Sequence, residues 1–309
     1  METAELGLTA VRGVQVAASL SAFGVAVFWS AVAPPVLAAD DPICRRVEDH
    51  LRRLFRASLA VAVGAGLVWL VAQAAFMAEA ESMADAAAAV WPVLTDTHFG
   101  HVLGTRLGLL ALSALVLGNG SSGGRRVLAA GTLAAALILH TWSTHAAAAA
   151  GVDRSILLGA ESLHLLAAGA WLGSLAPLFA MVTALAPDHC AHAARRFSPL
   201  GMLCVATLSA TALTQGWILI GGLPALVGTD YGRAALVKLA LLLVLLTFAA
   251  ANRFLYAPAL RGPVGADAKR GLCCSIAVET AFGLAAVLTA ALLADLPPAL
   301  HQQPVWPFG

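Results

Sequence analysis

Apolar residues recur along the chain in blocks of about 20, the length that a helix needs to cross about 30 Å of hydrocarbon. These blocks predict eight helices, at residues 10–33, 57–78, 99–118, 127–149, 155–185, 199–222, 232–255 and 271–294. A closed β-barrel would need short segments of alternating polarity, which the sequence lacks. We therefore predict an all-α, polytopic membrane protein, built as an eight-transmembrane-helix bundle.

The composition narrows the function classes. Of the 309 residues, 60% are apolar and 11% are charged, against roughly half and roughly a quarter in soluble domains. The mean hydropathy is +0.84, and the formal net charge of +1 provides no basic surface for nucleic acid. These values exclude a soluble enzyme, a nucleic-acid-binding module and a disordered scaffold. The lipid bilayer is the expected surrounding.

The basic residues predict how the helices are oriented. Thirteen of the 18 Lys and Arg residues lie in the loops after helices one, three, five and seven. Cytoplasmic loops carry such an excess, so we expect both termini outside (N-out/C-out). Glu2 and Glu5 precede a long apolar run, which favours a first span over a cleaved signal. We expect two four-helix halves, at residues 1–150 and 151–309.

Histidines and cysteines fall on opposite sides of this topology. Six histidines lie on the outer side or in the outer half, namely His98, His101, His140, His145, His164 and His301. All five cysteines lie on the inner side or in the inner half, namely Cys44, Cys190, Cys204, Cys273 and Cys274. One explanation is that cytosolic thiols stay reduced, so no disulfide is expected. The other is a gradient from imidazole, which suits Cu(II), to thiolate, which suits Cu(I).

Helical spacing groups the outer histidines with a carboxylate. His98 and His101 are three residues apart, as are Glu161 and His164, so each pair shares a helix face. His140 and His164 both lie about 13 Å below the outer ends of their helices, which a short turn joins. The predicted metal-binding set is therefore His98, His101, His140, His145, Glu161 and His164. Bis-histidine ligation of haem b by His140 and His164 is the alternative, and hydrogen-bonded packing is the plain one.

Other polar residues in the spans have several interpretations. Glu279, near the middle of the last helix, is a candidate proton carrier, because a carboxylate is costly to bury as an ion. Arg106, Arg233 and Lys238 are interpreted as anchors that snorkel to the surface, with a pair between Glu161 and Lys238 or Arg106 as an option. Gly169 and Gly173 form a small-xxx-small face, and a polar stripe on the sixth helix suggests contact between helices (Thr207, Thr211, Thr214 and Gln215).

The segment Asp188-His189-Cys190-Ala191-His192 carries metal-ligand chemistry. It is expected in a short loop, where metal binding and a plain solvated linker both remain open.

Several motifs in the second half resemble a known family. Ser162-Leu-His164-Leu-Leu-Ala-Ala-Gly-Ala-Trp171-Leu-Gly173-Ser-Leu175 is similar to the fifth-helix segment of the copper resistance D (CopD) membrane proteins. Further matches over about 155–295 are Arg196-Phe197-Ser198, Gly228-Thr229-Asp230-Tyr231-Gly232-Arg233, Lys238 and Asn252-Arg253.

The resemblance implies a multi-pass protein of the bacterial inner membrane that moves copper from periplasm to cytoplasm. It also implies a separate periplasmic copper-binding partner of the CopC type. His164 and Trp171 lie inside the matching motif. Tyr231, Lys238 and Asn252-Arg253 match as structural or gating positions.

Two functions compete on these grounds. The leading one is a copper importer, passive or proton-coupled, because the sequence has no G-x-x-x-x-G-K-[ST] motif for a nucleotide. The alternative is a membrane cytochrome that passes electrons or reduces Cu(II), which would make the protein an oxidoreductase. A copper-holding assembly factor ranks last. Copper, and haem b in the alternative, are the expected ligands. The sequence leaves the oligomeric state open.

Overall fold

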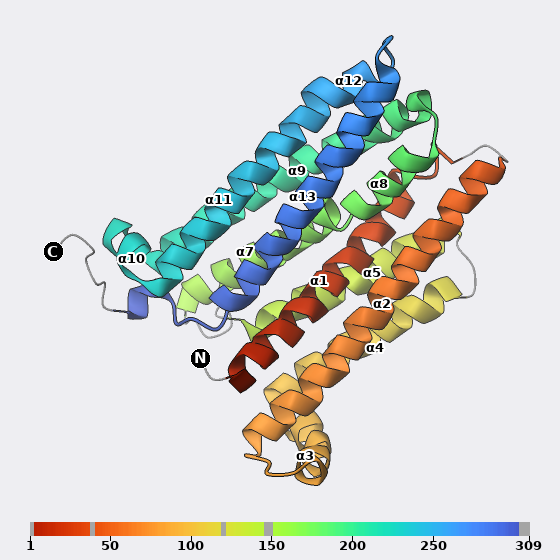
Figure 1. Cartoon of the computed structure of the whole chain (residues 1–309). Helices are drawn as coiled ribbons and strands as arrows, with labels where there is room; N and C mark the ends of the chain where they lie inside the picture. Colours follow the sequence, from red (N-terminus) through yellow and green to blue (C-terminus); the bar gives the residue numbers. More distant parts are fainter. Residues whose placement is uncertain (1–2, 38–40, 119–121, 145–150, 303–309) are drawn as a thin grey trace.

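The computed structural model describes residues 3–37, 41–118, 122–144 and 151–302, which are helical with short turns and contain no strand (Figure 1). The α-helices are α1 (Thr3–Ala31), α2 (Pro42–Met77), α3 (Met83–Asp96), α4 (His98–Gly118), α5 (Gly123–His140), α7 (Gly151–Leu172), α8 (Leu175–Ala184), α9 (Pro187–Ile220), α10 (Leu223–Gly228), α11 (Asp230–Ala251), α12 (Ala257–Ala259) and α13 (Gly265–Leu293). Short 3-10 turns at Thr141–Ser143 and Ala299–His301 and a π-helical turn at Asn252–Tyr256 complete them.

The eight predicted spans are confirmed. Eight helical stretches of the described residues are long and apolar enough to cross a membrane, and each contains one of the predicted apolar blocks or most of it. The long helices run side by side in one bundle, with α1 in the middle between helices of both halves (Figure 1).

Two ends of the bundle are defined by what they carry. At the histidine end, α1 begins, α4 begins with His98 and α5 ends with His140. Arg12 on α1 there pairs with Asp295 beyond α13 at 2.8 Å. At the arginine end, α2 and α9 begin with their Arg-containing turns. Arg126 there forms an ion pair with Glu48 at 2.6 Å.

The central helix meets the second half through glycine. A Cβ on Gly24 would overlap backbone atoms of Gly169 and Gly173, so α1 and α7 approach at backbone contact. Ser174 Oγ donates a 3.0 Å hydrogen bond to the carbonyl oxygen of Gly24 at the same place. The predicted small-residue face is therefore confirmed. The helix predicted over 155–185 is interrupted there, because α7 ends at Leu172 and α8 starts at Leu175.

Three sequence-based boundaries were wrong. Helix α2 begins at Pro42 rather than 57, because its first turns are amphipathic and bury Cys44, Val47, Leu51 and Phe55 at helical spacing. Helix α3 was not predicted at all, since it is too short to span. Ser82 caps it by accepting a 3.1 Å bond from the backbone N–H of Asp85. The His189–His192 segment lies in the first turns of α9, not in a loop.

Candidate functional site

Two polar clusters lie inside the bundle, one in each half. The His140 cluster consists of Gln15, Trp69, Arg106 and His140, on α1, α2, α4 and α5. The His164 cluster consists of Glu161, His164, Thr211, Tyr231 and Lys238, on α7, α9 and α11.

A hydrogen bond from α9 holds the ring of His164. His164 Nδ1 lies 2.9 Å from Thr211 Oγ1, and that hydroxyl donates its own proton to the carbonyl oxygen of Thr207 at 2.8 Å. The Thr211 oxygen therefore accepts a proton from His164, which assigns the Nδ1–H tautomer. The lone pair of Nε2 is then free to bind a metal ion. The predicted polar stripe on the sixth span thus orients the imidazole.

Glu161 lies one helical turn before His164, on the same face of α7. Lys238 and Tyr231, both from α11, interact electrostatically with it. The option of a pair between Glu161 and Lys238, rather than Arg106, is the one that the structure favours. The site therefore combines an imidazole with a carboxylate whose charge a lysine balances.

The start of α11 fixes the position of Tyr231. Thr229 caps the helix by accepting a 3.0 Å hydrogen bond from the backbone N–H of Gly232. Gly232 leaves no space for a Cβ, because the carbonyl oxygens of Ala225 and Leu226 in α10 lie against it. The Thr-x-Tyr-Gly motif thus builds a tight turn that points a buried tyrosine toward Glu161.

The His140 cluster is organised around a buried arginine. Arg106 Nη2 donates to Gln15 Oε1 at 2.7 Å, and its Nε donates to the carbonyl oxygen of Ala136 at 3.2 Å. Trp69 lies against both the guanidinium and the His140 ring, 6.0 and 6.4 Å from its ring centroid. Arg106 is 1% exposed. The prediction that it snorkels was wrong, because its face of α4 points into the bundle, where carbonyl and amide oxygens bind it.

The remaining predicted metal ligands lie near the histidine end. His98 and His101 are exposed, and each Nε2 contacts a backbone carbonyl oxygen, that of Trp142 at 3.2 Å and that of Thr95 at 2.6 Å. His145 lies outside the described residues. Within the described residues, no three His, Cys, Asp or Glu side chains come together as a metal site. What the structure brings together is the Glu161–His164 pair.

The haem alternative needs His140 and His164 to face each other across one macrocycle. Their contacts, over the residues that the structure describes, have no side chain in common. His140 lies among Trp69 and Arg106, and His164 lies against Thr211. The described contacts therefore do not form a haem pocket between these two histidines.

Glu279 is buried on α13, 1% exposed. Asn252 Nδ2 donates a 2.7 Å hydrogen bond to Glu279 Oε2, and the Trp171 indole reaches the same carboxyl group. Asn252 opens the π-helical turn that follows α11. Such π-turns are frequent at functional sites. Three residues that sequence reasoning treated separately, Trp171, Asn252 and Glu279, thus form one unit.

The cysteine side of the predicted gradient is structural at its best-ordered point. All five cysteines are free. Cys190 is buried, and its thiol donates to the carbonyl oxygens of Val182 and Leu185, both at 3.4 Å. His189 beside it is exposed and His192 is half-buried. The Cys190 thiol closes the turn between α8 and α9.

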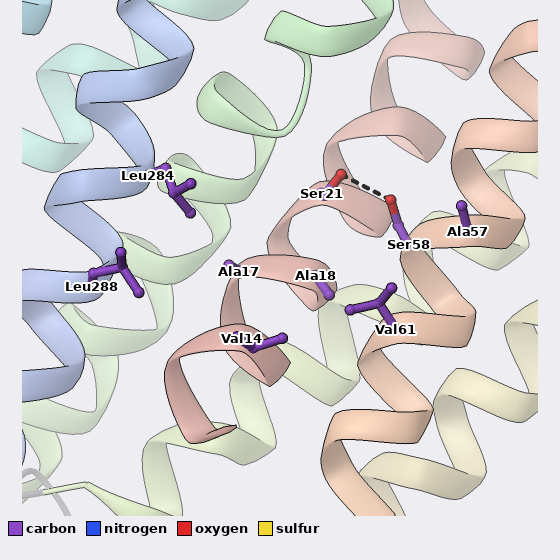
Figure 2. A pocket seen from close by; sticks show the side chains of 9 residues that line it. All are labelled: Val14, Ala17, Ala18, Ser21, Ala57, Ser58, Val61, Leu284 and Leu288. Atoms are coloured by element: carbon purple, nitrogen blue, oxygen red, sulfur yellow. Dashed lines mark hydrogen bonds between the residues drawn. The ribbon is translucent and has the colours of Figure 1, made fainter. Parts of the chain in front are cut away.

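A groove of about 350 Å³ runs over α1 between α2 and α13 (Figure 2). Its walls are small and aliphatic, with Val14, Ala18, Val61 and Leu284 among them. Its polar feature is the 2.9 Å hydrogen bond between the hydroxyls of Ser21 and Ser58. No titratable side chain lines it, so it is not the ion site.

Comparison with known proteins places these clusters in a family. The family model described as "Copper resistance protein D-like, N-terminal domain" matches residues 1–156, and "Copper resistance protein D" matches residues 191–293. The chain belongs to the copper resistance protein D family. It is accordingly a copper-related, multi-pass membrane protein.

Two curated relatives are similar to parts of the chain. "Copper transport protein CutJ" of Bacillus subtilis (strain 168) is 30% identical over 165 residues, which are 52% of this chain and 29% of that protein. "Inner membrane protein YebZ" of Escherichia coli (strain K12) is 26% identical over 212 residues, 68% of this chain and 72% of that protein. The chain thus spans less than a third of the length of the Bacillus relative. No solved structure matches.

Proposed function

We propose that this protein carries copper across the bacterial inner membrane into the cytoplasm, through the Glu161–His164 pair. The observation that carries the proposal is the hydrogen bond from His164 to Thr211, which leaves Nε2 of a membrane-embedded imidazole free beside a carboxylate. Membership of the copper resistance D family supports copper as the cargo. The names of the two relatives support transport and the inner membrane.

The direction follows from the two ends of the bundle. The positive-inside rule assigns the arginine end to the cytoplasm, so the histidine end faces the periplasm. His98, His101 and His145 would receive copper there, directly or from a separate CopC-type protein. Imidazole and carboxylate ligands suit Cu(II). Two ligands from one helix bind moderately, which suits a site that must release its ion.

Lys238 gives the empty site its charge balance. Its ammonium group interacts with Glu161 in the copper-free protein. An arriving copper ion would compete with Lys238 for the carboxylate. The site would therefore not hold an unpaired carboxylate inside the bundle before or after loading.

Glu279 is proposed as the carrier of a coupling proton. Its carboxyl group is buried against Asn252 and Trp171, close to the π-helical turn after α11. Glu279→Gln keeps the hydrogen-bonding shape and removes the exchangeable carboxyl proton. Copper uptake by the variant should no longer respond to an imposed pH gradient, whereas uptake by Glu81→Gln, altered in an exposed turn, should. An unchanged response in Glu279→Gln would remove Glu279 from the mechanism.

The proposal is tested by copper uptake into liposomes that contain the purified protein. His164→Ala should reduce uptake to that of protein-free liposomes, whereas His50→Ala, at an exposed position of α2 near the arginine end, should leave it unchanged. Unchanged uptake by His164→Ala would overturn the proposal. An absorption spectrum of the same sample addresses the cytochrome alternative, because a strong Soret band with sharp reduced α and β bands would replace transport with electron transfer.

A further inference from the structure

Three buried nitrogen atoms of the His140 cluster have no hydrogen-bond partner. They are Gln15 Nε2, Arg106 Nη1 and His140 Nδ1. Their side chains are 0%, 1% and 7% exposed. Buried polar groups are nearly always satisfied, so three such atoms in one cluster indicate a missing hydrogen-bonding group.

The three atoms belong to one site. Arg106 Nη2 bonds the amide oxygen of Gln15 at 2.7 Å, which places Gln15 Nε2 and Arg106 Nη1 beside the same contact. Arg106 Nε bonds the carbonyl oxygen of Ala136, one helical turn before His140 on α5. Trp69 packs against both the guanidinium and the imidazole.

The charge of this site is positive and uncompensated. No carboxylate in the described parts of the chain forms an ion pair with Arg106, whereas Arg12 pairs with Asp295 and Arg126 with Glu48. The charges that act on His140 come from Arg106 and Arg12, and both are cationic. A buried guanidinium without a counter-charge is costly.

We propose that the His140 cluster binds a small inorganic anion of the size of chloride. Arg106 Nη1 supplies the charged donor, Gln15 Nε2 the amide donor, and His140 Nδ1 a third N–H in the tautomer that an anion selects. The anion would reach the site from the histidine end, because His140 is the last residue of α5. This inference does not depend on the proposed copper transport.

Chloride is the probe for the test. Purified protein is compared in chloride and in gluconate at equal ionic strength, and binding is followed by the line width of the ³⁵Cl resonance. Saturation with chloride should raise the Tm by about 5 °C, the shift expected for a ligand at about 100 times its Kd. Equal Tm values and an unbroadened ³⁵Cl line would overturn the proposal in favour of water in the site.

A substitution that supplies the negative charge separates this site from any other. Gln15→Glu keeps the oxygen that Arg106 bonds and adds a tethered carboxylate, so the chloride dependence should disappear while the protein stays folded. Arg233→Gln, at an exposed arginine on α11 near the same end, should keep the dependence. Chloride dependence that persists in Gln15→Glu would place the anion elsewhere and overturn the proposal.

A direct measurement covers the case in which Gln15→Glu does not fold. Crystals of the unaltered protein grown in bromide should show an anomalous signal within hydrogen-bond distance of Arg106 Nη1. Bromide signals at other places alone would contradict the assignment.

Discussion

The two clusters place a histidine with the same elementary chemistry in opposite electrostatic surroundings. His140 lies beside Arg106, whose charge no carboxylate of the described residues pairs with, and Arg12 adds a second positive charge. His164 lies one turn from Glu161, whose carboxylate interacts with Lys238. A cation is repelled in the first cluster and attracted in the second. The pair of sites therefore shows that the neighbouring charges, more than the imidazole, decide which ion can bind.

The partner of each imidazole differs as well. Thr211 accepts a hydrogen bond from His164 Nδ1, so the ring has a fixed tautomer before any ion arrives. His140 Nδ1 is buried without a hydrogen-bond partner in the described structure. One ring is prepared to donate a lone pair, whereas the other has a polar atom that still needs a partner. This difference supports a copper ion at His164 and an anion at His140.

The largest effect is expected when the second cluster is made to resemble the first. Glu161→Gln removes the carboxylate and leaves the ammonium group of Lys238 without its counter-charge, as Arg106 is. Copper uptake should fall to background, because the cation then meets only positive charge. Uptake into liposomes measures it, with Glu81→Gln, in the exposed turn before α3, as the control. Uptake within twofold of wild type would show that charge does not distinguish the clusters.

A smaller effect is expected at the contact that joins the two halves. Gly24→Ala adds a Cβ that overlaps the backbone of Gly169 and Gly173. Overpacking of this kind costs about 1–3 kcal/mol. Gly64→Ala, on α2 with open space around it, should instead stabilise the helix by roughly 0.5–1 kcal/mol. Thermal unfolding of the purified variants should show shifts of opposite sign.

The same pair of variants tests whether the two clusters depend on one another. If the halves are held in register by Gly24, both chloride and copper binding should weaken in Gly24→Ala. A change in one ligand alone would show that the clusters are mechanically independent.

Much of the fold could be predicted from sequence because hydropathy reports spans directly. The failures occurred where helices are not uniformly apolar. The Arg-rich start of α2 is amphipathic, so the apolar run marked the span and not the helix. The short helix α3 carries too little apolar length to be noticed. Gly173 and Ser174 interrupt a continuous apolar run that gave no sign of a break.

The site was predicted only as far as one helix determines it. The spacing of Glu161 and His164 placed both on one face. The polar stripe around Thr211 was attributed to contact between helices, and its bond to His164 depends on how α7 and α9 pack. Arg106 was misjudged for the same reason, because depth along α4 can be counted from sequence, whereas the direction in which a residue faces depends on neighbouring helices.

The smallest effect, and the sharpest test of the second difference between the clusters, is expected at Thr211. Thr211→Val keeps the shape of the side chain and removes the oxygen that accepts from His164 Nδ1. The ring would lose its fixed tautomer, as His140 lacks one, and the copper affinity should fall by about tenfold, as for other partners that orient metal-binding histidines. Thr211→Ser should retain the affinity. Thr214→Val removes a hydroxyl that bonds only the carbonyl oxygen of Ala210 on its own helix, so it should have no effect. Copper titration followed by electron paramagnetic resonance measures both the affinity and the nitrogen coupling. An affinity unchanged in Thr211→Val would mean that the electrostatic difference between the clusters is sufficient and the orientation of the ring is not required.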